Sequence, residues 1–181
     1  TQMFEKAYKA NPSNADNIIN LIDVYGRAKN TEKALDLTKN AVQKEPNNKI
    51  FLYPYGTFLL NQEKFPEAIE QFKKAVEIDP AYGDAVYNLG VSYLNWGVVM
   101  KTESDKKAEA ERLKNKGKDV KLDMSYKEKF KEAVPYLEKA QESRSDDLGL
   151  LQQLGKVYAN LNMVEKSKAA FEKYDRLTKG K

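Results

Sequence analysis

Apolar residues recur at helical spacing in pairs of short stretches along this chain. Residues 49–80 contain two such sets, Leu52, Tyr55, Phe58 and Leu59 followed by Phe65, Ile69, Phe72 and Val76. Because residues three and four apart share one face of a helix, each set predicts one amphipathic helix. The polar residues 61–64 separate the two helices, and Pro80 ends the second because proline has no backbone N–H. The pattern therefore predicts a helical hairpin.

The same pattern returns at a fixed interval. Pro12, Pro46 and Pro80 are 34 residues apart, and an interval of that length is typical of stacked helix pairs. Counted from Ala15, Lys49, Gly83 and Leu148, the eighth position holds Ile22, Gly56, Gly90 and Gly155. The twentieth position holds Ala34, Ala68, Ala133 and Ser167, the twenty-fourth holds Thr38, Phe72, Leu137 and Phe171, and the twenty-seventh holds Ala41, Ala75, Ala140 and Tyr174. Small residues on apolar faces let helix backbones approach closely, so each pair is expected to cross tightly.

This distribution of small and large residues resembles that of the tetratricopeptide repeat family over nearly the whole chain. The resemblance implies an all-α fold, a right-handed solenoid of about four and a half helix pairs in a single domain. The expected units are a half repeat at 1–14 and repeats at 15–48, 49–82, 83–147 and 148–181. The positions that depart from the pattern are Ile22, Ser145, Ser167 and Tyr174. These departures predict looser packing at the two ends of the chain and near an insertion in the third repeat.

The insertion lies near residues 101–131, because Met100 and Lys131 would be equivalent in an uninterrupted repeat. It contains 11 Lys or Arg and 7 Asp or Glu, so its net charge of +4 accounts for that of the whole chain. Residues 101–116 favour a prolonged first helix, which Gly117 breaks. An extended segment is expected next, before helix resumes near Lys127, because apolar and polar residues alternate at Val120, Leu122, Met124 and Tyr126. We favour a projecting helical arm over a mobile, solvated loop, because Ala108, Leu113 and the alternating residues can pack.

Prolines and capping residues refine the expected helix bounds. Pro66 lies in the first turn of a helix, where the missing N–H matters little. Pro54 lies several residues inside a helix and predicts a bend or a delayed start, and Pro135 predicts a kink. Two groups of side chains are expected to cap the helices that follow them, Ser13, Asn14 and Asp16, and Ser145, Asp146 and Asp147.

The composition removes several kinds of chemistry. The chain has no cysteine and no histidine, which excludes disulfides, thiol chemistry, imidazole acid–base catalysis and the usual zinc ligands. We therefore expect no cofactor and no metal site. No apolar run approaches the ~20 residues of a membrane span. The missing cysteines and the abundant lysines favour the bacterial periplasm or cell envelope over the cytoplasm. We expect a piece of a longer protein, whose exposed end repeats provide a route to self-association.

The family resemblance also implies a binding surface. In that family the second, fifth, sixth, ninth, twelfth and thirteenth positions face a concave groove, where solenoids commonly bind partners. The candidate residues are Asn20, Asp23, Arg27, Tyr53, Thr57, Asn61, Asp84, Tyr87, Asn88, Val91, Asn95, Gln152, Lys156 and Asn160. Amide side chains can pair with both the N–H and the C=O of an extended peptide, and tyrosine adds apolar area. We predict a peptide groove centred on Tyr53, Tyr87, Asn88 and Asn95; the alternative is that these residues only solvate an open face.

Other ligands fit the sequence less well. One specialisation of the family binds the carboxylate terminus of chaperones through Lys, Asn and Arg at set positions. In the two possible registers those positions hold Ile19, Asp23, Pro54, Asp84 and Asn88, or Tyr53, Thr57, Asn88, Gly149 and Gln153. Only one residue matches, so this ligand is not expected. Nucleic acid is disfavoured because the lysines of the insertion alternate with acidic residues.

The sequence therefore predicts a non-enzymatic protein-interaction module that binds a peptide or protein segment in its groove. Paired carboxylates such as Asp146 and Asp147 are explained by helix capping rather than by catalysis. The alternative function is a scaffold subunit that docks through the inserted arm, residues 101–128, or through the end repeats.

Overall fold

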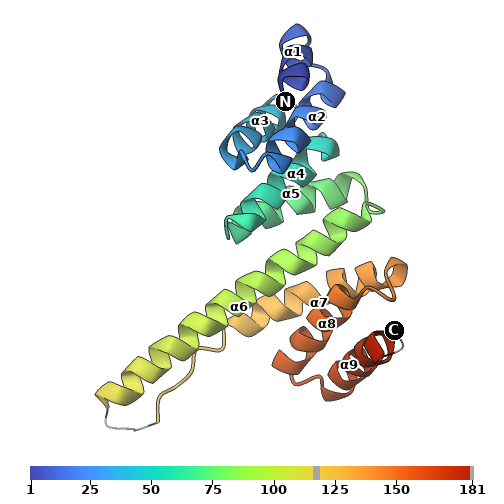
Figure 1. Cartoon of the computed structure of the whole chain (residues 1–181). Helices are drawn as coiled ribbons and strands as arrows, with labels where there is room; N and C mark the ends of the chain where they lie inside the picture. Colours follow the sequence, from blue (N-terminus) through green and yellow to red (C-terminus); the bar gives the residue numbers. More distant parts are fainter. Residues whose placement is uncertain (116–118, 180–181) are drawn as a thin grey trace. The chain divides into compact units, whose positions relative to one another are not determined.

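The computed structural model describes residues 1–115 and 119–179, and the regular structure within these ranges is helical throughout (Figure 1). The helices are α1 (Gln2–Ala10), α2 (Ala15–Arg27), α3 (Thr31–Lys44), α4 (Lys49–Asn61), α5 (Phe65–Ile78), α6 (Gly83–Lys114), α7 (Tyr126–Ser143), α8 (Leu148–Asn160) and α9 (Val164–Lys179). They follow the hairpins predicted from the repeat, with α2 and α3 forming the first complete pair.

The chain divides into two compact units, Thr1–Ala85 and Val86–Lys181. In the first unit, one apolar cluster contains Ile18, Leu21, Ile22, Leu37, Ala41 and Phe51, and a second contains Leu52, Ala75 and Ala85. In the second unit, the large side chains with no exposed surface include Phe130, Leu137, Leu150, Leu151, Leu154 and Val157. Each unit therefore buries the apolar faces of its own hairpins.

Asparagine and aspartate side chains begin several of the helices. The side-chain oxygen of Asn14 accepts from the backbone N–H of Asn17 at 2.9 Å, and that of Asp147 accepts from Leu150 at 2.9 Å. Both residues belong to the groups predicted to act as caps. Asn48 acts in the same way at the start of α4, accepting from the N–H of Ile50 at 3.0 Å. These bonds satisfy N–H groups that have no partner inside the helix.

The turn inside each hairpin places the fifteenth repeat position in the left-handed region of backbone space. Lys29, Glu63 and Asn162 have φ angles of 56°, 58° and 59°. The corresponding residue of the third repeat is Gly97, which lies inside α6 because that helix continues into the insertion. A Cβ atom added to Gly97 would lie 2.7 Å from the Phe130 ring. The glycine is therefore needed for the close approach of α7 and not for a turn.

Glycine at the eighth position lets the two helices of a hairpin touch. A Cβ atom on Gly56 would lie 2.8 Å from the Phe72 ring, and one on Gly155 would lie 2.7 Å from the Phe171 ring. The same atom on Gly90 would lie 2.8 Å from Leu137. In each case the neighbour is the residue at the twenty-fourth position, so the tight crossing predicted from the small residues is confirmed.

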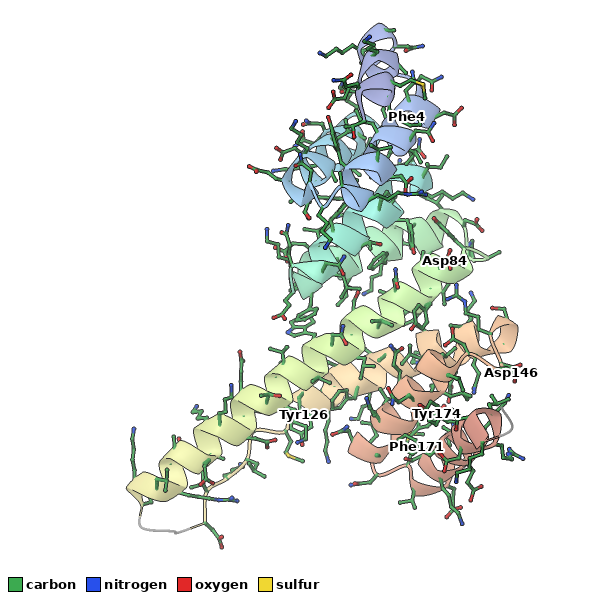
Figure 2. The ribbon with its side chains drawn as sticks, viewed as in Figure 1. Phe4, Asp84, Tyr126, Asp146, Phe171 and Tyr174 are labelled. Carbon is green, nitrogen blue, oxygen red and sulfur yellow. The ribbon has the colours of Figure 1, made fainter. Side chains whose placement is uncertain are left out.

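The departures from the repeat pattern have different consequences. Ile22 is 5% exposed and Thr38 is fully buried, so the looser packing predicted at Ile22 is wrong. Ser167 is also buried, and its hydroxyl donates to the backbone oxygen of Gly155 at 3.0 Å. In α9, Phe171 is exposed and Tyr174 half-buried, which agrees with looser packing in the last repeat (Figure 2).

The inserted segment forms a helical arm, as predicted. Helix α6 continues through residue 114, whereas Gly117, the predicted breaker, lies outside the described residues. The returning residues 119–125 are non-helical, and the hydroxyl of Ser104 donates to the backbone oxygen of Asp123 at 2.8 Å. Ala108 is buried, and α7 begins at Tyr126, one residue before the predicted start (Figure 2). Within the described ranges, no helix has both the length and the apolar character that a bilayer span requires.

The three helical prolines occupy different environments. Pro66 lies in the first turn of α5, as predicted. Pro54 and Pro135 lie inside α4 and α7. Helix α4 nevertheless begins at Lys49, so the delayed start considered for Pro54 does not occur. Pro54 therefore removes a hydrogen bond from within a continuous helix.

Candidate peptide-binding site

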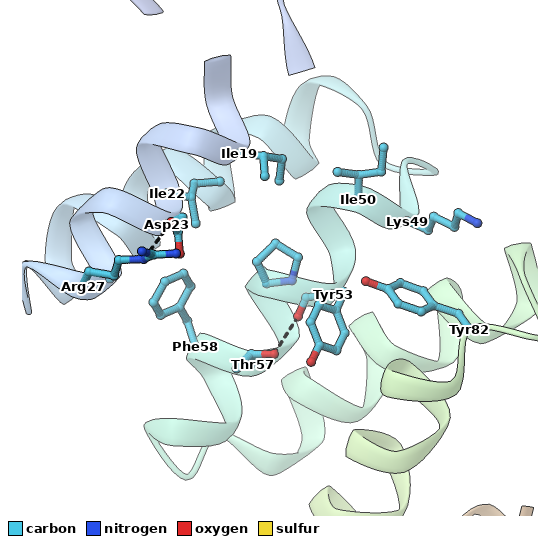
Figure 3. Close-up of a pocket in the computed structure, with 12 residues that line it drawn as sticks. Ile19, Ile22, Asp23, Arg27, Lys49, Ile50, Tyr53, Thr57, Phe58 and Tyr82 are labelled. Carbon is cyan, nitrogen blue, oxygen red and sulfur yellow. Dashed lines mark hydrogen bonds and ion pairs between the residues drawn. The ribbon is translucent and has the colours of Figure 1, made fainter. Parts of the chain in front are cut away.

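A pocket of 640 Å³ lies between α2 and α4 in the first unit, and we call it the α2–α4 pocket (Figure 3). Its lining residues are Ile19, Ile22, Asp23, Gly26 and Arg27 of α2, Lys49, Ile50, Tyr53, Pro54, Thr57 and Phe58 of α4, and Tyr82 of the loop after α5. Figure 3 shows Ile19 and Ile22 projecting from α2 toward the side chains of α4. Apolar and aromatic side chains thus form most of its wall.

Aromatic residues form one side of the pocket. The rings of Tyr53 and Tyr82 have centroids 5.2 Å apart, and Tyr53 also lies 6.0 Å from the buried ring of Phe72. Burial, with smaller contributions from the neighbouring tyrosine and carboxylates, raises the pKa of the Tyr82 phenol to about 12. The Tyr82 phenol therefore stays neutral at physiological pH.

The charged residues of the pocket are held in ion pairs. The Nζ atom of Lys49 lies 2.5 Å from Oδ2 of Asp79 and 5.8 Å from the centre of the Tyr82 ring. The hydrogen bond from Lys49, together with one from the backbone N–H of Ala81, lowers the pKa of the Asp79 carboxyl. At the other end of the pocket, Nε of Arg27 lies 2.9 Å from Oδ2 of Asp23. Each cation at the pocket thus has an anionic neighbour.

The hydroxyl of Thr57 has a local partner within α4. It donates to the backbone oxygen of Tyr53 at 3.0 Å (Figure 3). This bond uses the hydroxyl's hydrogen within α4. The Thr57 hydroxyl is therefore not a free donor for a charged ligand.

Four of the predicted groove residues line this pocket, namely Asp23, Arg27, Tyr53 and Thr57. Three other predicted residues of the first unit, Asn20, Asn61 and Asp84, are exposed and do not line it. The remaining predicted residues lie in the second unit, with Tyr87, Asn88, Val91 and Asn95 on α6 and Gln152, Lys156 and Asn160 on α8. The predicted centre at Tyr53, Tyr87, Asn88 and Asn95 is therefore divided between the two units.

Several candidate residues of the second unit have polar or aromatic neighbours. The backbone oxygen of Asn88 accepts from the Ser92 hydroxyl at 2.7 Å. The Arg144 guanidinium lies 5.1 Å from the centre of the Tyr87 ring. On α8, Nζ of Lys156 donates to Oε1 of Gln152 at 3.3 Å, and Nδ2 of Asn160 donates to the backbone oxygen of Lys156 at 2.8 Å. The two bonds on α8 hold the side chains of Lys156 and Asn160 along that helix.

The sequence interpretation missed most of the apolar wall. It selected amides and tyrosines by repeat position and assigned no role to Ile19, Ile50 or Tyr82. Two signals in the sequence pointed to this region. Ile22 stands where the other repeats have glycine, and Pro54 interrupts the hydrogen bonding of a helix.

Comparisons with known proteins find repeats of one family in two parts of the chain. Residues 58–97 match a family model described as "TPR repeat", and residues 148–180 match one described as "Tetratricopeptide repeat". A peroxisomal targeting signal receptor of Candida albicans is 30% identical over 101 residues, which are 54% of this chain and 17% of the receptor. The chain thus spans less than a fifth of that relative.

Two solved structures share the fold over almost the whole chain. The MamA protein has a TM-score of 0.71 at 17% identity, and the comparison covers 98% of this chain and 80% of MamA. YrrB, described as a TPR protein with an unusual peptide-binding site, has a TM-score of 0.70 at 22% identity, with 98% of this chain and 75% of YrrB covered. At these identities the similarity concerns the fold.

The hairpins, their interlocking glycine and aromatic residues, and the matches together define an α-helical repeat protein of the protein-interaction class. The chain is a tetratricopeptide repeat protein, as its residue pattern predicted. Repeats of this family serve as protein-interaction modules, and their scaffold is typically non-catalytic.

Proposed function

We propose that this chain binds an extended segment of a partner protein and holds one apolar side chain of that segment in the α2–α4 pocket. The observation that carries this proposal is the apolar wall of Ile19, Ile22, Ile50 and Phe58 around a volume of 640 Å³. Ligand pockets commonly enclose about 300–1,000 Å³ and combine an apolar lining with a few polar groups. The pocket therefore has the size and lining expected of an anchor site.

The charges at the pocket favour a neutral occupant. Lys49 is paired with Asp79 and Arg27 with Asp23, so a charged ligand would have to compete with existing ion pairs. An apolar side chain needs no such exchange and is stabilised by removal of its surface from water. We therefore infer that leucine or phenylalanine is preferred over lysine or glutamate at the anchor.

The proposal is tested with Gly/Ser host peptides that carry a single guest residue, Leu, Phe, Lys or Glu. The peptides are titrated into the ¹⁵N-labelled chain, and shifts of the backbone amide signals report binding. We expect the Leu and Phe peptides to shift amides of α2 and α4 at several-fold lower concentration than the Lys and Glu peptides. Equal responses to all four guests would contradict the proposal.

An exposed residue of the pocket wall provides a matched pair of variants. Ile50 is 47% exposed, so Ile50→Glu should leave the fold intact while introducing a charge into the pocket. The control is Val98→Glu, because Val98 is 46% exposed on α6 and does not line the pocket. Binding of the Leu peptide is expected to fall at least tenfold in the first variant and to remain unchanged in the second.

We retain the predicted residues of the second unit as further candidate contacts. Tyr87, Asn88, Val91 and Asn95 on α6 offer the mixture of amide and apolar surface that suits an extended backbone. Replacing Asn88 and Asn95 with Ala tests them, with an expected loss of ~1 kcal/mol for each hydrogen bond to a bound segment. Unchanged binding of a partner segment would remove them from the site.

Scaffold docking through the inserted arm is the second candidate function. One observation favours it, since the arm is tied to its returning segment by the Ser104–Asp123 bond while Leu113, Leu122 and Met124 remain exposed. Apolar side chains on an ordered projection are available to a partner surface. Deletion of the arm separates this function from peptide binding.

A further inference from the structure

A backbone carbonyl at the wall of the α2–α4 pocket lacks its regular helical donor. In an α-helix the N–H of each residue donates to the carbonyl four residues earlier. Pro54 has no N–H and lies inside α4, which begins at Lys49. The carbonyl of Ile50 therefore has no donor at the position where a regular helix would supply one.

The residue that carries this carbonyl lines the pocket. Both Ile50 and Pro54 line it, and they are one helical turn apart on the same face of α4. The N–H of Ile50 is already used, because it donates to the side chain of Asn48 at 3.0 Å. The acceptor left by Pro54 thus lies next to apolar side chains, where an unmatched polar group is unfavourable.

Two polar side chains of the lining, those of Thr57 and Lys49, have other partners. The Thr57 hydroxyl donates to the Tyr53 carbonyl, and the Lys49 ammonium group is paired with Asp79. A ligand N–H that reaches the carbonyl supplies the donor that Pro54 lacks, and such a hydrogen bond adds to the affinity. An extended peptide carries such a donor beside every side chain except proline.

We propose that the Ile50 carbonyl accepts a hydrogen bond from a backbone N–H of the bound segment, adjacent to the side chain that enters the pocket. This inference rests on the proposed peptide binding and adds the class of ligand to it. The pocket selects an extended segment with an apolar residue whose own N–H, or that of the following residue, is free. Segments with proline or an N-methyl group at the donating position bind more weakly.

A double-mutant cycle tests the hydrogen bond. One change is Pro54→Ala, which restores an N–H inside α4 and places a residue of high helix propensity there. The other change is in the ligand, with the Leu host peptide compared with two versions N-methylated at Leu or at the next residue. In the wild-type chain one of the N-methylated peptides should bind about five-fold more weakly, the effect of one lost hydrogen bond.

In the Pro54→Ala chain that ratio should fall to about one, because the carbonyl is then engaged by α4 itself. Conformational effects of N-methylation act equally on both proteins and cancel in the cycle. Pro135→Ala is the matched control, because Pro135 also lies inside a helix but does not line the pocket. The same ratio in the wild-type and Pro54→Ala chains would overturn the proposal.

A second measurement uses the wild-type chain alone. The ¹³C signal of the Ile50 carbonyl should move when the unmethylated Leu peptide binds, and not when the weaker N-methylated peptide is raised to equal occupancy. An equal carbonyl shift with both peptides would also overturn the proposal.

The two experiments distinguish failure of this inference from failure of the proposed function. If the guest residue alters affinity but the double-mutant cycle is additive, the proposed hydrogen bond is wrong and the proposed binding of an apolar side chain is unaffected. If all guest residues bind equally, the proposed function itself is wrong.

Discussion

The hairpins α2–α3 and α4–α5 have the same repeat positions but distribute large and small residues in opposite ways. In α4–α5 the first helix contributes Gly56 and the second contributes Phe72, whose ring lies where a Cβ on Gly56 would be. In α2–α3 the first helix contributes the large residue, Ile22, and the second contributes Thr38. All these positions are buried. The large side chain at the contact therefore comes from the first helix in α2–α3 and from the second helix in α4–α5.

The difference has a consequence for the α2–α4 pocket. A glycine has no side chain to present to a neighbouring repeat, whereas Ile22 both joins the apolar cluster of the first unit and lines the α2–α4 pocket. The hairpin that reverses the usual order therefore gives the pocket part of its wall. Because protein interiors are close-packed, the combined volume of the two side chains must fit the space between the helices.

The largest effect on stability is expected from Gly56→Ile. This variant places the large residue of α2–α3 in α4 while the large Phe72 stays in α5. The new side chain would overlap the Phe72 ring, and overpacking of this kind destabilises by about 3 kcal/mol. Adding Phe72→Thr reproduces the order of α2–α3 and should relieve the overlap, with a favourable coupling of about 2 kcal/mol. Urea unfolding of the wild-type chain, both single variants and the double variant measures this coupling.

Gly26→Ala provides the control for the glycine substitution. Nothing lies within 4 Å of a Cβ atom at Gly26, and the residue is inside α2, so a slight gain in stability is expected. Additive effects of the Gly56 and Phe72 substitutions would show that the two positions do not share one volume.

A smaller effect on stability is expected from the ion pair at the start of the α4–α5 hairpin, which the α2–α3 hairpin lacks at the corresponding position. Helix α4 begins with Lys49, paired with Asp79, whereas α2 begins with Ala15. Because the folded pKa of Asp79 is lowered from its usual 3.8, the pair stabilises the fold above that pH, and the contribution is lost as the pH falls through the folded pKa. The stability difference between the wild-type chain and Lys49→Met should therefore be greatest near neutral pH and shrink below about pH 4.

Urea midpoints at pH 6 and at pH 3 measure this difference. Lys74→Met removes the same charge from the exposed pair with Glu70 inside α5, and so controls for net charge. A difference between wild type and Lys49→Met that grows toward acidic pH would contradict the assigned ion pair.

The smallest effect is expected from removing the arm. The α6–α7 hairpin keeps the glycine contacts of the other repeats at Gly90 and Gly97, and both lie outside residues 101–128. Replacing these residues with a short Gly/Ser linker should leave binding of the Leu peptide unchanged. Abolished binding in this variant, together with unchanged binding in Ile50→Glu, would favour the scaffold function instead.

Local sequence signals identified the elements well. The helical hairpins, the capping by Asn14 and Asp147, and the continuation of α6 into the insertion follow from residues close together in the chain. Prediction of the pocket lining was less complete. Repeat position selected Asp23, Arg27, Tyr53 and Thr57, but not Ile19, Ile22 and Ile50, because the space that these side chains line depends on how two helices meet.

The sequence by itself determined the helical hairpins, their 34-residue interval and the close contacts at glycine. These features arise from propensity, spacing and side-chain size, which act between near neighbours. Only the tertiary structure decided that Ile19, Ile50 and Tyr82 surround a pocket, and that Pro54 is also part of its lining. A pocket is the space that packed helices do not fill, so its position depends on how distant side chains meet across that space.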